Sequence, residues 1–232
     1  MIPKSIECLT AAHDLCVAGY AVHVYEMSDR LGGLMAWGIP AFRLPGGVID
    51  EDIKRLTDKC EGLRVHLETA LGRDVSLDQL KQRHDAVLLS IGAWWGKPMD
   101  IPGEDHPQVV DGVGFLRRVN AGERPSLPES VVVVGGGDVA MDACRVARRL
   151  PGCEQVRVIY RRGPEEIPAR RIELDGALKE GIEFIYHTQP IGVEAGAEGS
   201  LGLRCVATTL GEPGEDGRRQ PLAVPGSEHE IE

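Results

Sequence analysis

The clearest pattern of apolar and polar positions lies between residues 130 and 160. Residues 130–134 (SVVVV) form an almost continuous apolar run, which is typical of a strand buried on both faces. Three glycines follow at once, and residues 138–150 then predict a helix that ends before Pro151 and Gly152. Residues 156–160 predict the next strand. The order of strand, glycine turn, helix and strand predicts an α/β unit with a parallel sheet.

The end of the same pattern occurs near the N-terminus. Residues 10–18 predict the end of an amphipathic helix closed by Gly19, and residues 21–25 (AVHVY) predict a short strand. A helix is expected over 48–60, because Val48, Ile49, Ile53 and Leu56 can share one face. Strands are expected over 65–67 and over 86–91 (AVLLSI), the second of the buried type. Further along the chain, the pattern predicts a helix over 171–180, a strand over 182–186 and a surface loop from Gly211. Two such units predict two nucleotide-binding α/β modules.

Composition narrows the class of protein. The 232 residues are 42% hydrophobic and 27% charged, as in an ordinary globular protein. No run approaches the roughly 18 apolar residues of a transmembrane helix. The net charge of −10 and the aromatic content of 4% argue against nucleic acid or an anionic membrane as the main partner. The six cysteines form no C-x-x-C pair, so we expect free thiols in a reducing cytoplasm, and the seven histidines show no metal-binding spacing.

The glycine turn has the form of a dinucleotide-binding fingerprint. Gly135 and Gly137 occupy its first two glycine positions, and Ala140 occupies the third. Glycine at the first position permits a tight turn, and at the second it lets the backbone approach a pyrophosphate. A small third residue keeps the helix close to the strand. The N–H groups and the dipole of the following helix then favour bound phosphates.

The ends of the two following strands indicate which nucleotide each module prefers. Arg161 and Arg162 follow residues 156–160 where an NAD-binding protein has a carboxylate, which predicts that the 2′-phosphate of NADP(H) is bound there. Glu26 follows residues 21–25, which suits the adenosine ribose of FAD or NAD. However, no glycine motif precedes the helix at 10–18, because the chain begins MIPKSIECLTAAHDL.

Four segments together resemble one family of proteins. The runs GYAVHVYEMSDRLGGLMAWGIPAFRLP, LLSIGAWWGKPMDIPGED, VVVVGGGDVAMDACRVARRL and VIYRRGPEEIPA are similar to the small (β) subunit of NADPH-dependent glutamate synthase, and the same module occurs in dihydropyrimidine dehydrogenase. The resemblance implies an NADPH domain inserted into an FAD domain of the pyridine nucleotide-disulfide oxidoreductase type. It implies FAD contacts at Glu26, Arg30, Gly33, Leu34, Arg43, Val75 and Gly92, and NADPH contacts at Gly135, Gly137, Asp138, Val139, Ala140, Arg161, Arg162 and Arg170.

The resemblance also implies a division of the chain and a function. It places a partial FAD-binding domain at 1–95, a connector at 96–128, an NADPH-binding domain at 129–225 and the start of the return to the FAD domain at 226–232. Hydride would pass from NADPH to the flavin, and electrons would pass on to iron–sulfur centres of a larger partner, without a catalytic side chain. The family's glycine motif before the first helix, its C-terminal FAD segment and its cysteine-rich domain are missing. The alternatives are therefore a truncated NADP-binding remnant and a docking subunit, neither able to retain FAD.

Overall fold

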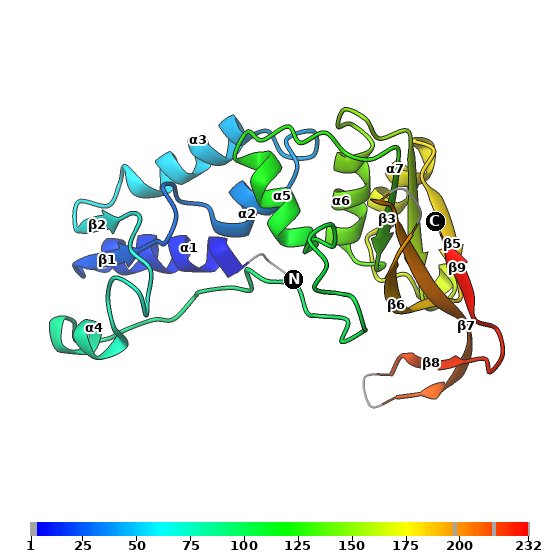
Figure 1. The fold of residues 1–232 in the computed structure, drawn as a ribbon. Coiled ribbons are helices and arrows are strands. Elements are labelled where there is room, and N and C mark those ends of the chain that lie inside the picture. Colours follow the sequence, from blue (N-terminus) through cyan, green and yellow to red (C-terminus); the bar gives the residue numbers. More distant parts are fainter. Residues whose placement is uncertain (1–3, 197–198, 215–216, 232) are drawn as a thin grey trace. The chain divides into compact units, whose positions relative to one another are not determined.

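The computed structural model describes residues 4–196, 199–214 and 217–231 (Figure 1). Four short segments lie outside this description: residues 1–3 and 232, at the ends of the expected FAD-domain segments, residues 197–198 of the expected NADPH domain, and residues 215–216 of the expected tail loop. The chain divides into two compact units, Met1–Trp94 and Trp95–Glu232, which we call unit 1 and unit 2 and describe separately. No helix within the described ranges is both long and apolar enough to span a bilayer.

Unit 1 is built around a parallel pair of strands. Its described elements are α1 (Lys4–Val17), β1 (Val22–Tyr25), α2 (Gly33–Gly38), α3 (Gly46–Thr57), β2 (Leu63–His66) and α4 (Leu77–Arg83). Helix α1 packs against β1, α2 and α3, and Leu9, Ala12 and Val24 are buried there. The expected helix ending before Gly19 and the strand after it are confirmed. Val48, expected on the inner face of α3, is 48% exposed instead.

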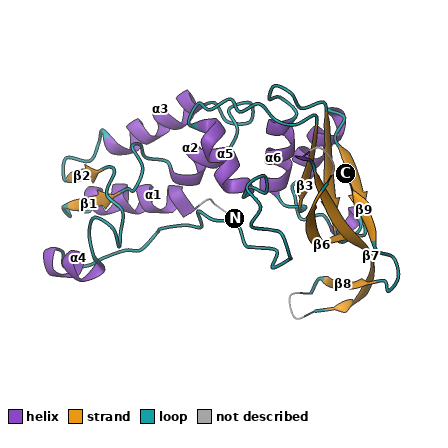
Figure 2. Cartoon of the chain, viewed as in Figure 1, coloured by secondary structure: helices purple, strands orange, loops and turns teal. Residues whose placement is uncertain are grey.

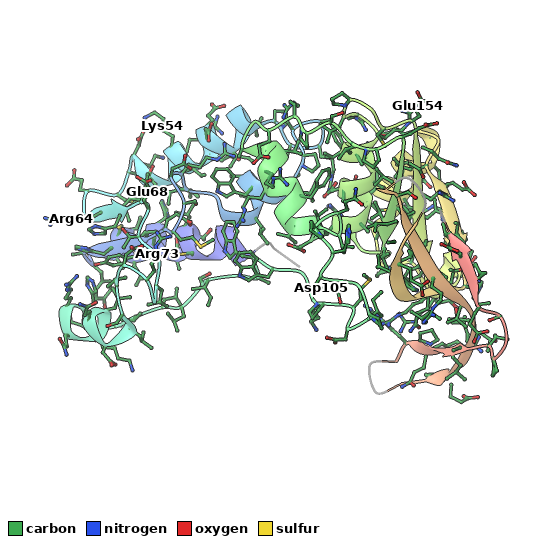
Figure 3. All side chains as sticks on the ribbon, in the orientation of Figure 1. Lys54, Arg64, Glu68, Arg73, Asp105 and Glu154 are labelled. Carbon is green, nitrogen blue, oxygen red and sulfur yellow. The ribbon has the colours of Figure 1, made fainter. Side chains whose placement is uncertain are left out.

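The expected strand at 86–91 is wrong. Residues 84–111 contain no helix or strand, and Figure 2 shows this stretch as loop. Leu88, Leu89 and Ile91 are 65%, 53% and 65% exposed. The physical reason is the lack of a partner: β1 pairs with β2, and no described strand pairs with residues 86–91. The charged side chains of Lys54 and Arg64 also project outward from this unit (Figure 3).

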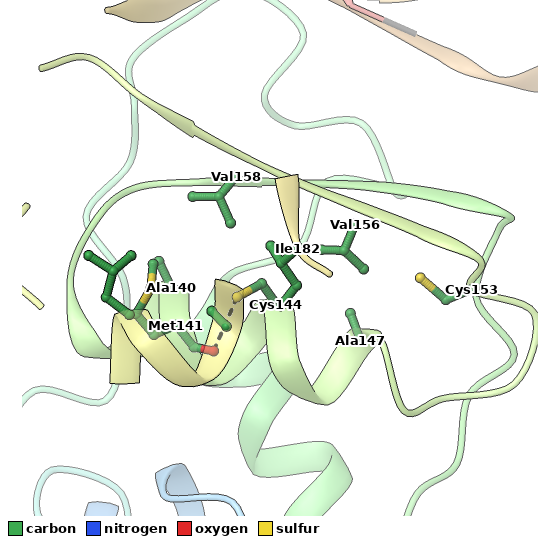
Figure 4. Close-up of a cluster of buried hydrophobic side chains, with 10 residues drawn as sticks. Ala140, Met141, Cys144, Ala147, Cys153, Val156, Val158 and Ile182 are labelled. Carbon is green, nitrogen blue, oxygen red and sulfur yellow. Dashed lines mark hydrogen bonds between the residues drawn. The ribbon is translucent and has the colours of Figure 1, made fainter. Parts of the chain in front are cut away.

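Unit 2 contains the parallel sheet that the sequence predicts. Its first part consists of α5 (Gly112–Asn120), β3 (Ser130–Val134), α6 (Asp138–Ala147), β4 (Gln155–Tyr160), the 3-10 helix η1 (Pro164–Glu166), α7 (Arg171–Lys179) and β5 (Glu183–Tyr186). The strands lie in the order β3-β4-β5. Met141 and Cys144 of α6 pack with Val156 and Val158 of β4 in the core (Figure 4). Within residues 96–128, the expected connector, α5 buries Leu116 against α6.

The second part of unit 2 is an antiparallel sheet that pattern analysis missed. It consists of β6 (Thr188–Ala195), β7 (Leu201–Pro213), β8 (Arg219–Ala223) and β9 (His229–Ile231), with β7 pairing to the other three. The surface loop expected from Gly211 is therefore wrong. Glycine, proline and charge conceal β8 because most of its residues are exposed on both faces. Residues 226–231, expected to start the return to the FAD domain, contribute β9 to this sheet.

The cysteines are free, as expected. The buried thiols are those of Cys60, Cys144, Cys153 and Cys205. Burial raises the pKa of the Cys144 thiol to about 12 and that of Cys205 to about 11. These two side chains therefore serve as small apolar core residues, because the reactive thiolate is disfavoured at both sites.

Candidate nucleotide-binding site

The turn between β3 and α6 requires glycine at its first position. Gly135 has a φ of +133°, a backbone conformation that other residues rarely adopt. Its N–H donates to the carbonyl of Ile159 on the neighbouring strand at 3.0 Å, which fixes the turn to the sheet. A Cβ at Gly135 would lie 3.6 Å from the Cβ of Ala140, so α6 passes close to the turn. The small residue at 140 permits this approach.

The second and third glycines differ in what surrounds them. A Cβ at Gly136 would lie 2.7 Å from the ring of Tyr160, whose hydroxyl donates to the carbonyl of Glu166 at 2.7 Å. Gly136 is therefore needed for packing, a requirement that the fingerprint alone does not reveal. In contrast, no heavy atom lies within 4 Å of a Cβ built on Gly137. The backbone at Gly137 consequently faces open space at the start of α6, where a ligand can approach it.

The start of α6 also carries a carboxylate whose charge is balanced. Asp138 accepts hydrogen bonds from the backbone N–H of Arg170 at 3.0 Å and from its Nε at 2.9 Å. The guanidinium of Arg170 also lies 3.8 Å from Glu173. An uncompensated carboxylate here would repel a bound phosphate, so this ion pair makes the helix start compatible with an anion. The structure thus brings together Asp138 and Arg170, which are distant in sequence.

The two arginines after β4 have different environments. Arg161 is exposed, whereas Arg162 is only 9% exposed and donates from Nε to the carbonyl of Arg219 at 2.7 Å. The carbonyl of Arg161 accepts from the hydroxyl of Thr208 at 2.8 Å, and that of Arg162 accepts from the N–H of His187 at 3.1 Å. The antiparallel sheet therefore holds the backbone of both arginines. Sequence reasoning missed Thr208 and His187, because β6 and β7 were not expected.

In unit 1, short-range hydrogen bonds hold the loop that follows β1. Glu26 accepts hydrogen bonds at Oε1 from the N–H and the hydroxyl of Ser28, at 2.9 and 2.6 Å. Arg30 donates to the carbonyl of Ala36 at 2.9 Å, and its guanidinium lies 4.0 Å from the ring centroid of Trp37. The structure therefore gathers Glu26 and Arg30 in one loop next to the start of α2.

The other residues implied for FAD lie in several segments of unit 1. Gly33 and Leu34 begin α2, and Gly33 is buried with a φ of +49°. Val75 is buried in a turn where its carbonyl accepts from the N–H of Gly72 at 2.8 Å. Arg43 is partly buried after α2, and Gly92 is exposed in the loop after α4.

Among residues 4–94, the part of unit 1 that the structure describes, the fit to FAD rests on the carboxylate of Glu26, which follows β1 and suits a ribose.

Comparison with known proteins places these observations in a family. The model of the pyridine nucleotide-disulphide oxidoreductases matches residues 9–215. The chain is 40% identical to the β subunit of an NADP(+)-dependent formate dehydrogenase from Moorella thermoacetica, over 95% of this chain and 31% of the relative. It is 40% identical to the β subunit of an NADPH-Fe(3+) oxidoreductase from Geobacter sulfurreducens, over 97% and 34%. It is 36% identical to the glutamate synthase [NADPH] small chain of Azospirillum brasilense, over 97% and 48%.

The solved structures agree on the fold. FprA from Mycobacterium tuberculosis, solved in complex with NADPH, superposes with a TM-score of 0.84 at 20% identity, covering 99% of this chain and 66% of FprA. Thioredoxin reductase from Lactococcus lactis gives a TM-score of 0.56 at 17% identity, covering 95% and 72%. The resemblance to glutamate synthase small chains and the α/β fold are confirmed. The chain spans about a third to a half of the length of these curated relatives.

Proposed function

The chain belongs to the pyridine nucleotide-disulphide oxidoreductase family, and from this premise we propose that it is the NADPH-binding part of a flavoprotein oxidoreductase similar to the glutamate synthase small chain. Members of this family bind FAD and NAD(P). The observation that carries the proposal is the open backbone at Gly137 and the exposed Arg161, which follow the adjacent parallel strands β3 and β4 at their carboxyl ends. Ligands of open α/β sheets bind at this end.

Each residue of this site has a distinct role in the proposal. The backbone at Gly137, Asp138, Val139 and Ala140 holds the pyrophosphate at the start of α6. Arg170 neutralises Asp138, as the ion pair between them indicates. Arg161 binds the 2′-phosphate, and the buried charge of Arg162 adds to the positive potential there while its Nε anchors β8. NADPH supplies hydride when bound, so these residues need only bind and orient it.

The onward path of the electrons is also proposed. The relatives are named as subunits of a formate dehydrogenase, an Fe(3+) oxidoreductase and a glutamate synthase. On that basis we expect a larger partner, and the resemblance to the glutamate synthase small chain leads us to expect that this partner contains iron–sulfur centres and receives electrons through FAD. The domain assignment, with an FAD-binding segment at 1–95 and an NADPH-binding domain at 129–225, belongs to this proposal. Glu26, Arg30, Gly33, Leu34, Arg43, Val75 and Gly92 are its candidate FAD contacts.

A second candidate is an NADPH-binding chain that does not retain FAD by itself. It is favoured by the exposed apolar side chains of Leu88, Leu89 and Ile91. The absorbance spectrum of the purified chain separates the two. A stoichiometric flavin band supports the flavoprotein, whereas a colourless chain that still binds NADPH supports the second candidate.

Nucleotide selectivity tests the NADPH site itself. Replacing Arg161 with Ala should weaken NADPH binding by about 10- to 100-fold and leave NADH binding unchanged, because only NADPH carries the 2′-phosphate. Titration calorimetry of the full chain with each nucleotide measures this. Arg171→Ala is the matched control, since Arg171 is an exposed arginine of the same unit that pairs with Asp175. An equal loss for both nucleotides in Arg161→Ala would show that the assignment is wrong.

A further inference from the structure

One residue beside the candidate site has a strained backbone. His187, between β5 and β6, has a φ of +52°, in the left-handed region that residues other than glycine rarely adopt. Its N–H donates to the carbonyl of Arg162 at 3.1 Å, and its carbonyl accepts from the N–H of Thr208 at 2.7 Å. Strain of this kind persists only where the surrounding structure enforces it, and it is concentrated at functional sites. Here two neighbours hold the backbone of His187 in place.

The strand register places His187 next to Arg161. Strands β4 and β5 are parallel, and Tyr160 is paired with Tyr186. The residues that follow these two strands are Arg161 after β4 and His187 after β5, at the same carboxyl edge of the sheet. Neighbouring strands lie about 4.8 Å apart. Both residues are exposed, so the register brings an arginine and a histidine to the edge of the sheet where the 2′-phosphate is proposed to bind.

The imidazole lies against the loop that follows Arg161. A Cβ built on Gly163 would lie 3.0 Å from Nε2 of His187 and 2.8 Å from a carboxylate oxygen of Glu166. Glycine at 163 thus leaves room for both side chains. The ring therefore lies against the loop that directly follows Arg161 and Arg162.

We propose that His187 determines specificity for the adenosine 2′-phosphate by donating an imidazole N–H to it beside Arg161. This inference rests on the proposed NADPH site. If the position served only to shape the backbone, glycine would adopt this φ with less strain. The imidazole instead provides a donor that suits a phosphate oxygen.

The test uses the full 232-residue chain with two replacements. His187→Asn tolerates a positive φ and removes the imidazole, and His187→Gly removes both the side chain and the strain. Dissociation constants are measured for NADPH and NADH, and for adenosine 2′,5′-bisphosphate and AMP, which lack the nicotinamide. We expect both variants to bind NADPH and the bisphosphate about tenfold more weakly, with NADH and AMP unchanged. His229→Asn, an exposed histidine on β9, is the control.

The outcomes separate this inference from the site on which it depends. If Arg161→Ala loses NADPH selectivity while both His187 variants keep it, the site stands and the role of His187 is overturned. If the His187 variants weaken all four ligands equally, His187 acts on the backbone and the inference is again overturned. If the unmodified chain does not prefer NADPH over NADH, the proposed site itself fails.

Discussion

The two parallel sheets of this chain differ in what surrounds them. In unit 2, β4 lies between β3 and β5, and Val158 and Ile159 on its opposite faces are fully buried. In unit 1, β1 has β2 on one edge, and of the residues in these two strands only Val24 is buried. One face of the unit 1 pair carries rings instead of aliphatic side chains, since His23 and Tyr25 stack with His66.

The difference shows that a core in an α/β unit depends on strands at both edges of the central strand. Strand β4 is buried because neighbouring strands satisfy its backbone on both sides, while α6 and the antiparallel sheet cover its faces. Strand β1 lacks the second neighbour among the described residues. Isolated pairs of strands are marginally stable. We therefore expect most of the cooperative stability of the chain to reside in unit 2.

The largest effect should come from charging the centre of unit 2. Val158→Asp places a carboxylate where the side chain is 0% exposed and packs within a cluster of apolar residues. An unpaired buried charge should destabilise the unit by about 3–5 kcal/mol. Urea unfolding followed by circular dichroism measures this loss. Leu222→Asp, at a half-exposed position of β8, should change the free energy of unfolding by less than about 0.5 kcal/mol. Similar losses in both variants would contradict the burial of β4.

The sequence predicts unit 2 up to β5 because each local signal agrees with the fold. The glycines at 135–137 occur in the turn after β3, and β3 itself (residues 130–134) pairs with β4. The apolar pattern fails to predict the structure of residues 86–91, because it indicates that a segment favours burial and not whether a partner strand is present to pair with it. It also fails for β8 and β9, which are short strands of mostly exposed residues that pair with β7 through backbone groups.

The candidate site likewise contains residues that the sequence predicts and residues that it does not predict. Gly135, Gly137 and Ala140 could be predicted, since their roles follow from backbone geometry near the motif. Arg162 could be predicted as a basic residue, but its burial depends on β8, which the pattern does not reveal. His187 gave no signal, because its position depends on the register of β4 and β5 and on contacts from β7.

A smaller effect should appear in unit 1 as the pH falls. His23 Nδ1 and His66 Nε2 lie 3.0 Å apart, so one nitrogen must donate and the other accept. Burial, and then the charges of His84, His66 and Arg64, lower the pKa of His23. The unfolded chain therefore binds a proton more readily than the folded one. The contribution of the neutral His23 to the free energy of unfolding is fully present above the ordinary histidine pKa of about 6.5 and is lost as the pH falls below it.

The measurement is the melting temperature of the full chain between pH 8 and pH 5, about 1.5 units on either side of the ordinary histidine pKa. His23→Thr, which keeps a β-branched residue in the strand, should flatten the decline on the acidic side. His106→Gln, at an exposed position of unit 2, should leave the decline unchanged. An identical decline in the His23 variant would exclude this pair as its cause.

The smallest effect should come from the exposed apolar segment itself. Leu88→Ser changes a side chain that is 65% exposed and packs in no described core, so the free energy of unfolding should change by less than about 0.5 kcal/mol. Val133→Ser, in the equally apolar β3, should cost more, because Val133 packs against the buried cluster of unit 2. Urea unfolding compares the two directly. If Leu88→Ser were as damaging as Val133→Ser, residues 86–91 would have to be buried in solution, and the contrast between the two sheets would disappear. If Leu88→Ser also improves solubility, that would identify the segment as an exposed apolar patch.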